Sequence, residues 1–177
     1  MADEPDVSLL ERFAHGDRDA FEALFRRYQA DVYRWILRIV RERSAAEDVL
    51  VETFWRAYRA RARFDWSRSF GAWIRRIATN AARDHLRAAR GRAMTVPLTT
   101  EPQAPAASDR ALAESIALAF RRLPPKLQIV ATLALVEDCP HAEIADALDV
   151  PLGTVKSRLF RALRALRKEL ARLGVRP

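Results

Sequence analysis

The chain contains little cysteine, glycine and histidine. Its 177 residues include one cysteine, five glycines and three histidines. The single cysteine, Cys139, excludes a disulfide within the chain. Hydrophobic residues make up 50% of the sequence, and alanine, leucine and arginine are abundant, a composition that excludes an all-β or a disordered protein. We therefore expect an all-α fold with one modest core or two small ones.

Long hydrophobic runs are also absent. The longest run, IVATLALV at 129–136, is far shorter than the roughly 20 residues that a membrane-spanning helix needs. The acidic start MADEPDVSLLERF has neither the basic segment nor the apolar segment of a secretory signal. We expect a cytoplasmic protein with no direct membrane insertion.

Motifs of enzyme chemistry are missing as well. The sequence has no glycine-rich phosphate loop and no motif that arranges a serine, a histidine and an acid. Cys139 and His141 are close in sequence, but two ligands are too few for a metal site, and His15 and His85 have no ligand-like spacing to them. We expect no catalytic residue, no metal, no cofactor and no small-molecule substrate, and we expect Cys139 to be a buried or half-buried residue.

Positive charge is plentiful and falls in two places. The formal net charge is +8. Residues 71–94 hold six arginines against Asp84, and residues 153–176 hold eight lysines or arginines against Glu169. Two separate basic stretches indicate a polyanion that is contacted at two places, although a solvated surface would show the same composition.

Apolar residues recur at helical spacing along most of the first ninety residues. Asp17 can cap one helix, and Ser44 with Glu47 fits a capping box at the start of the next. After the turn RFDWSRS a third helix begins at Phe70. The apolar faces expected on these three helices are Phe21, Leu24, Phe25, Tyr28, Val32, Ile36 and Ile39, then Leu50, Val51, Phe54, Trp55 and Tyr58, then Phe70, Trp73, Ile74, Ile77 and Ala81.

The helical rhythm stops at GRAMTVPLTTEPQAPAAS, residues 91–108. Three prolines, a glycine and scattered threonines leave nothing to bury, which predicts a flexible linker. We therefore expect two small helical domains, residues 1–90 and residues 109–177, on either side of it.

The second domain is expected to end in a helix-turn-helix. Ser108 can cap its first helix, and Pro124 and Pro125 end that helix and permit a new start. Further on, a short helix, a three-residue turn at 149–151 and a longer basic helix follow one another, as in a helix-turn-helix.

A helical wheel divides residues 153–168 into two sides. The side expected to face the core consists of Val155, Leu159, Ala162 and Leu166. The opposite side consists of Gly153, Ser157, Phe160, Arg161 and Arg164, with Lys156 and Arg158 on its flanks. In a major groove the outward groups can reach base edges, the flanking cations can meet phosphates, and the free amides near Gly153 and Thr154 attract a phosphate oxygen. A charged solvent face is the alternative.

A second polar row lies on residues 70–90. Its members are spaced four, three and four apart: Arg76, Asn80, Arg83 and Arg87. The amide of Asn80 can read a base edge because it both donates and accepts, whereas arginines mainly contact phosphates. The preceding loop offers Phe64, Trp66 and Phe70, whose rings could stack on unpaired bases, although most such aromatics are core residues.

Both halves of the chain resemble a known family. The segment AEDVLVETFWRAYRARARFDWSRSFGAWIRRIATNAARDHLR resembles region 2 of extracytoplasmic-function (ECF, group IV) sigma factors of the sigma-70 family. The segment LPPKLQIVATLALVEDCPHAEIADALDVPLGTVKSRLFRALRALRKEL resembles their region 4. The resemblance implies an alternative sigma factor that binds core RNA polymerase, directs it to specific promoter DNA and promotes DNA opening. It also implies an anti-sigma factor as a partner, which can hold the protein at the inner membrane.

The resemblance implies roles for particular residues. Contact with core polymerase falls on Asp48, Glu52, Thr53 and Phe54. Recognition of the minus-10 element falls on Phe64, Trp66, Ser69, Phe70, Arg76, Asn80, Arg83 and Arg87. Recognition of the minus-35 element falls on Thr154, Lys156, Ser157, Arg158, Phe160 and Arg161. On the helix expected to carry the polymerase contact, a helical wheel exposes Asp48, Glu52, Arg56 and Arg59. These residues could equally form ordinary salt bridges between positions four apart.

Three residues depart from the family pattern. Val51 stands where the family usually has glutamine, Pro140 where a serine normally caps the first helix of the helix-turn-helix, and Asp149 where glycine is common. Proline is acceptable in a first turn, and aspartate tolerates a left-handed conformation better than most residues, so neither change should break the motif.

The main alternative is a helix-turn-helix regulator that binds an operator without polymerase. Other such families also carry TVK at the start of the recognition helix, usually beside a sensor or receiver domain. The first ninety residues lack the alternating β and α signals of such a domain, which favours the sigma factor.

Overall fold

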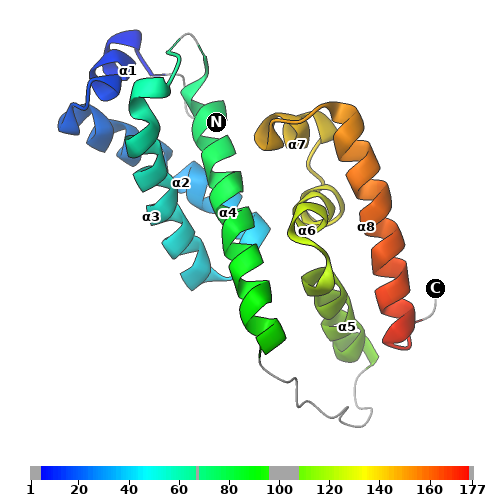
Figure 1. Ribbon diagram of the computed structural model, residues 1–177. Coiled ribbons are helices and arrows are strands. Elements are labelled where there is room, and N and C mark those ends of the chain that lie inside the picture. The colour runs from blue at the N-terminus through cyan, green and yellow to red at the C-terminus, as the bar shows by residue number, and fades with distance from the viewer. Residues whose placement is uncertain (1–4, 67, 96–107, 176–177) are drawn as a thin grey trace. The chain divides into compact units, whose positions relative to one another are not determined.

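The structure is a computed structural model that describes residues 5–66, 68–95 and 108–175, except for the side chains of 92–95 and 108–110. Within these ranges every regular element is a helix, which confirms the all-α fold class (Figure 1). The chain divides into two compact units, which are described separately: residues up to His85 together with Asp146–Asp149, and Leu86–Ala145 together with the residues from Val150 onward.

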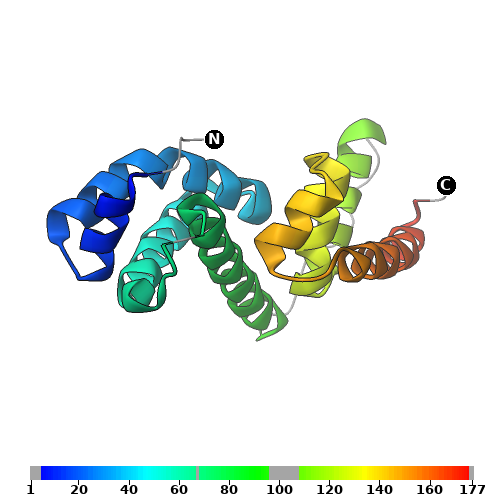
Figure 2. The same cartoon turned by 90° about the horizontal axis from the view of Figure 1, so that it is seen from above.

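The first unit contains three helices and most of a fourth. Their bounds are α1 (Val7–Ala14), α2 (Arg18–Val40), α3 (Arg43–Ala60), a short 3-10 turn (Arg61–Arg63) and α4 (Phe70–Thr95). Within this unit α3 and α4 lie side by side, as Figures 1 and 2 both show.

The starts of α2 and α3 are both capped by carboxylates. Asp17 caps α2 as predicted, because its Oδ1 accepts from the amides of Asp19 (2.8 Å) and Ala20 (3.1 Å). The predicted capping box of Ser44 and Glu47 is wrong. The side chain of Glu42 instead accepts from the amides of Ser44 and Ala45, so that α3 begins before Ser44 rather than after it.

The core of the first unit is rich in aromatic side chains. The predicted stripes on α2 and α4 are largely confirmed, with Leu24, Ile36 and Ile74 fully buried. Trp35, which the predicted stripe omits, is also buried, and its Nε1 donates to Thr79 Oγ1 at 2.9 Å. This bond ties α2 to α4 and satisfies a polar group inside the core.

The predicted apolar face of α3 is only partly correct. Phe54 is buried, but Val51 is 69% exposed and Trp55 is 55% exposed. Their places in the core are taken by Val49, Thr53 and other small residues of the same helix. One side of α3 therefore presents two large apolar residues to solvent.

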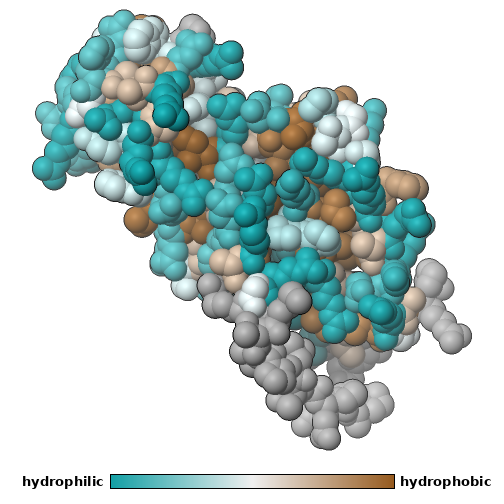
Figure 3. Space-filling view, viewed as in Figure 1, coloured by the Kyte–Doolittle hydropathy of each residue, from teal (hydrophilic) through white to brown (hydrophobic). Residues whose placement is uncertain are grey.

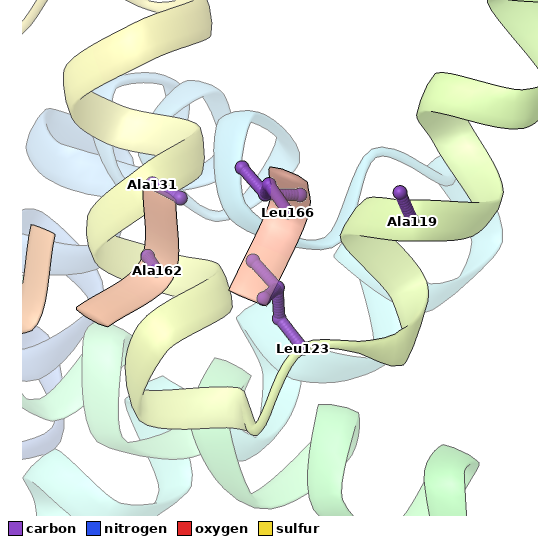
Figure 4. Close-up of a cluster of buried hydrophobic side chains, with 5 residues drawn as sticks. All are labelled: Ala119, Leu123, Ala131, Ala162 and Leu166. Carbon is purple, nitrogen blue, oxygen red and sulfur yellow. The ribbon is translucent and has the colours of Figure 1, made fainter. Parts of the chain in front are cut away.

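Besides the end of α4, the second unit contains three whole helices, most of a fourth (α7) and a π-helical turn. Their bounds are α5 (Ser108–Arg122), α6 (Pro125–Ala131), the turn η2 (Thr132–Val136), α7 (His141–Leu148) and α8 (Leu152–Arg172). Pro125 occupies the first turn of α6, as predicted, with Pro124 in the capping position. The helices α5, α6 and α8 meet in a cluster of buried residues, shown in Figure 4, that consists of Ala119, Leu123, Ala131, Ala162 and Leu166. The prediction of a buried or half-buried Cys139 is confirmed, since it is 7% exposed.

The boundary between the halves differs from the predicted linker. Residues 91–95 are helical because α4 continues to Thr95, past Gly91. Glycine in a helix costs only about 1 kcal/mol, and the alanines and arginines around it are good helix formers. Residues 96–107 and the side chain of Ser108 lie outside the described residues, so the linker and that cap stay predictions, as do the predicted domain boundaries.

The predicted helix-turn-helix is confirmed. The turn between α7 and α8 is made by Asp149, Val150 and Pro151. Asp149 has a φ of 53°, so it adopts the left-handed conformation that aspartate tolerates. The amide of Val150 bonds back to the carbonyl of Ala145 at 3.1 Å, and the carbonyl of Pro151 accepts from Thr154 at 2.8 Å at the start of α8. Pro140 directly precedes α7, and its carbonyl accepts from the amide of Ile144.

Candidate nucleic-acid interface

The helix α8 has one apolar side and one polar side, as its wheel predicted. Val155, Ala162 and Leu166 are buried, and Leu159 is half-buried. The outward residues Gly153, Ser157, Phe160, Arg161 and Arg164 are all exposed. Of the residues assigned to the minus-35 element, Lys156 is exposed, whereas Thr154 and Arg158 are half-buried at the edge of this side.

Phe160 is the most unusual side chain on the outward side of α8. It is 63% exposed, although burying a phenylalanine side chain normally gains about 1.5 to 3 kcal/mol. The hydroxyl of Ser157, one turn earlier, donates to the carbonyl of Thr154 at 3.0 Å. Its oxygen can still accept, so the outward side combines an apolar ring with polar groups that suit base edges.

The cations of α8 differ from those of the first unit in their partners. Within the described part of the chain, six cations of α8 have no carboxylate within ion-pair distance: Lys156, Arg158, Arg161, Arg164, Arg167 and Lys168. Several arginines of the first unit do pair with a carboxylate, among them Arg12, Arg26, Arg34, Arg56 and Arg68. The positive charge of α8 is therefore available to an external polyanion.

The single acid of α8 is used within the second unit. Glu169 accepts from Arg122 of α5 at 3.1 Å and from Arg172 at 3.2 Å. These hydrogen bonds, the one from Arg122 foremost, lower the pKa of Glu169. The carboxylate thus attaches α8 to α5.

The loop before α4 corrects two of the predicted base-stacking residues. Phe64 is 4% exposed and Phe70 is 1% exposed, and their rings pack edge to face with centroids 5.5 Å apart. Phe70 also packs edge to face on Phe13 of α1, at 5.7 Å. Both are core residues that cannot stack on a base in this conformation, whereas Trp66 is 44% exposed.

The remaining minus-10 candidates lie at the start and along the length of α4. Ser69 is exposed, and its Oγ accepts from the amide of Ala72 at 3.2 Å, so it helps to begin the helix. The row on α4 forms as predicted, with Arg76, Asn80 and Arg83 half-buried and Arg87 exposed.

The helix α3 corrects two of the predicted polymerase contacts. Thr53 is 0% exposed, with its hydroxyl bonded to the carbonyl of Val49 at 2.7 Å, and Phe54 is 3% exposed. Asp48 and Glu52 are exposed, as predicted. The pair Val51 and Trp55, which the sequence pattern placed in the core, lies on the same exposed side of α3.

The exposed side of α3 also shows the salt bridge that was the alternative interpretation of this strip. Arg56 Nε lies 2.7 Å from Glu52 Oε1, four residues earlier. We call Asp48, Val51, Glu52 and Trp55 the polymerase strip, after the contact that the family resemblance implies for this helix. Hydrophilic side chains cover most of the face seen in Figure 3, with apolar side chains between them.

No helix among the described residues is both long and apolar enough to span a membrane.

Two family models match the chain. Residues 24–92 match Sigma-70 region 2, and residues 113–166 match Sigma-70 region 4. The first match contains the polymerase strip and the row on α4, and the second contains α7, the turn and α8 as far as Leu166.

Relatives of known function match along most of their length. The RNA polymerase sigma-H factor of Pseudomonas aeruginosa is 33% identical in an alignment 185 positions long, and the match covers 96% of each protein. The ECF RNA polymerase sigma factor SigW of Bacillus subtilis is 32% identical in an alignment 170 positions long, and the match covers 88% of this chain and 91% of SigW.

Solved structures share the fold. CnrH, solved in complex with the cytosolic domain of CnrY, is 25% identical with a TM-score of 0.55, and the match covers 94% of this chain and 97% of CnrH. The sigma factor RpoE of Bartonella quintana, solved with the anti-sigma factor NepR, is 19% identical with a TM-score of 0.52, and the match covers 85% of this chain and 96% of RpoE. These likenesses concern the fold. The two matched regions and the relatives that match over most of their length place the chain in the sigma-70 family, as a sigma factor of the extracytoplasmic-function group.

Proposed function

We propose that this sigma factor directs core RNA polymerase to promoters by holding the minus-35 element on α8 and the minus-10 element on the first unit. The observation that carries the proposal is the outward side of α8, where an exposed Phe160 and Ser157 lie among six cations without ion-pair partners in the described part of the chain. Cations at the edges of a helix suit phosphates, and polar and apolar groups between them suit base edges.

In the minus-35 element, Phe160 and Arg161 have different chemical tasks. Arginine donates two hydrogen bonds to guanine, and the C5-methyl of thymine is the apolar group that a major groove displays. We assign Arg161 to a guanine and Phe160 to a thymine, with Lys156 and Arg158 on flanking phosphates. The amides at the start of α8 add a further phosphate contact.

The first unit supports DNA opening through selective binding. A surface that binds unstacked bases, and not paired ones, shifts the duplex toward the open state. The exposed ring of Trp66 suits stacking, and the amide of Asn80 suits a base edge, with Arg76, Arg83 and Arg87 along the same row. In this proposal the protein makes and breaks no covalent bond, and it needs no cofactor or metal.

Core polymerase binds the polymerase strip. Its centre is apolar, with Val51 and Trp55, and its acids Asp48 and Glu52 lie beside them. A tryptophan surrounded by charged residues is the composition of a binding hot spot. Valine in place of the usual glutamine at 51 extends the apolar centre rather than disrupting it.

An anti-sigma factor is the expected inhibitor. CnrH, the 25% identical relative, was solved with the cytosolic domain of CnrY. By extension, a cytosolic segment of a partner protein covers this chain's polymerase strip and keeps it from polymerase. The site of action is the cytoplasm, where polymerase and promoter DNA are found.

Transcription from a promoter library tests the proposal. Purified core polymerase is incubated with the library in the presence and absence of this chain, and the start sites are sequenced. We expect a set of starts that depends on the chain and shares two upstream elements. The operator-binding alternative predicts instead that the chain binds duplex DNA tightly without polymerase and adds no start sites to the core enzyme.

A further inference from the structure

Arg56 joins the two helices that carry the proposed polymerase and promoter contacts. Its Nε donates to Glu52 Oε1 of α3 at 2.7 Å, and its Nη1 donates to Asp84 Oδ2 of α4 at 2.8 Å. Both bonds lie within the first unit, where α3 and α4 run side by side (Figure 2). One guanidinium therefore contacts an acid of the polymerase strip and an acid of the promoter-facing helix.

Asp84 is an exception on its helix. It is the one acidic residue of α4, whose sequence otherwise contributes arginines to the proposed promoter contact. It directly follows Arg83 and precedes Arg87 by one turn. A carboxylate at this position repels DNA phosphates unless a cation neutralises it.

Arg56 is better placed than Arg83 to neutralise Asp84. The nearest approach of Arg83 to the same carboxylate is 3.9 Å from its Nε to Oδ1, beyond hydrogen-bond distance, whereas Arg56 makes a bond of 2.8 Å. Arg56 stays charged throughout the working pH range, since the bonds to Asp84 and then to Glu52 raise its guanidinium pKa further.

We propose that Arg56 is a positioning residue that masks the charge of Asp84, so that the arginine row of α4 meets promoter DNA without an unneutralised acid in its midst. This inference rests on the proposed function, because it takes α4 as the promoter-facing helix. It also links the two surfaces: a partner that draws Glu52 of the polymerase strip away from Arg56 leaves the guanidinium wholly to Asp84.

The competing explanation is that the pair is a simple clamp between α3 and α4. Charge masking and a clamp predict different results when the acid is removed. If Arg56 acts by masking, the loss of its charge lowers promoter affinity only while Asp84 is charged. Adding Asp84→Asn to the Arg56→Gln chain then restores promoter affinity. If the pair is a clamp, each single change breaks it and the second change repairs nothing.

Promoter affinity of reconstituted holoenzyme distinguishes the two. The parent, R56Q, D84N and R56Q/D84N chains are each assembled with core polymerase and titrated with one promoter from the library at several salt concentrations. We expect R56Q to weaken binding about three- to tenfold near 0.1 M salt, with a smaller loss at high salt, because the effect is electrostatic. We expect D84N and the double variant to bind within about twofold of the parent or more tightly.

The control is Arg43→Gln, which removes one charge from an exposed position at the start of α3 and is expected to leave affinity unchanged. Core affinity and thermal unfolding are measured for every variant, which separates promoter effects from loss of polymerase binding or of fold. Three results would overturn the masking role. They are a promoter affinity of the double variant as low as that of R56Q, an affinity of D84N as low as that of R56Q, and an affinity of R56Q equal to that of the parent. Failure of the proposed function itself shows differently, as a parent chain that gives holoenzyme no promoter binding at all.

Discussion

Arg122 of α5 donates a hydrogen bond to Glu169 of α8, with Nη1 and Oε2 3.1 Å apart. The two residues are 47 positions apart in sequence, and the bond holds the acid of α8 against the body of the second unit. Because α8's only carboxylate is engaged there, the cations on its outward side keep their charge for an external partner. The bond also makes the stability of the second unit depend on pH.

Replacement of Glu169 by glutamine should lower stability at neutral pH and have little effect in acid. The pKa of Glu169 is lower in the folded chain than its ordinary value of 4.5, because of Arg122 and then Arg172. A depressed folded-state pKa stabilises the fold above the unfolded-state pKa, and this stability is lost as pH falls through the folded-state pKa. Thermal unfolding of the parent and Glu169→Gln chains between pH 3 and 7 checks this. The difference in melting temperature should be constant above about pH 5.5 and shrink below pH 4.5; a difference that is flat throughout would contradict it.

Arg161 and Phe160 should select different bases of the minus-35 element. Arg161→Ala is expected to relax preference at one position and to cost about 1 to 3 kcal/mol of promoter binding. Phe160→Ala is expected to abolish discrimination between thymine and deoxyuridine, which differ by one methyl, a preference worth about fourfold in the parent. Selection from a library measures the first effect, and binding to promoters with single deoxyuridine substitutions measures the second. Arg26→Ala, which removes a cation paired with Glu22 in the first unit, serves as the control. Unchanged base preferences would show that neither residue recognises a base of the minus-35 element.

Asn80 should act in promoter opening and not in polymerase binding. Asn80→Ala is expected to reduce open complex about three- to tenfold, the typical net value of a lost hydrogen bond, with core affinity unchanged. Permanganate reactivity of thymines around the start site measures opening. Gln29→Ala, which removes an amide from α2, is the matched control. Equal reactivity of the Asn80→Ala and parent complexes would show that this amide does not read an unpaired base.

Truncation of Trp55 should weaken core binding, whereas truncation of its neighbour Phe54 should lower the stability of the fold. Trp55 is 55% exposed in the middle of the polymerase strip, so Trp55→Ala is expected to weaken core binding about tenfold with little change in melting temperature. Phe54 is 3% exposed and packs on Phe25 with ring centroids 4.7 Å apart, so Phe54→Ala should lower the free energy of unfolding by about 3 to 5 kcal/mol. Polymerase titration and thermal unfolding of both variants make the comparison. Full core affinity of Trp55→Ala would exclude this tryptophan from the interface.

Sequence patterns correctly predicted the helix caps and turns that depend on only one or two neighbouring residues. The Asp17 cap, the proline start of α6 and the turn at Asp149 each follow from the conformational preference of one or two residues. The two sides of α8 were also predictable, because its aliphatic residues fall on one side and only Phe160 among its large apolar residues lies on the other.

Tertiary packing decided the features that the sequence pattern misassigned. The helix α3 has apolar residues on more than one side, so periodicity alone cannot show that Phe54 faces the core while Val51 and Trp55 face solvent. Likewise Phe70 packs on Phe13, more than 50 positions earlier, and Phe64 packs on Phe70. The contact between Phe70 and Phe13 joins residues far apart in sequence, so no local pattern predicts it. The cap by Glu42 is not predicted because Ser44 and Glu47, two and five positions later, fit the capping-box pattern.

A footprint of the holoenzyme on one promoter from the library tests most directly whether both surfaces hold the same DNA. Hydroxyl-radical cleavage and permanganate reactivity are compared for the chain alone, core polymerase alone and the two together. We expect protection of an upstream element together with reactive thymines in a downstream element, in the combined sample only. An equal footprint by the chain alone, or protection upstream without any opened downstream segment, would contradict it.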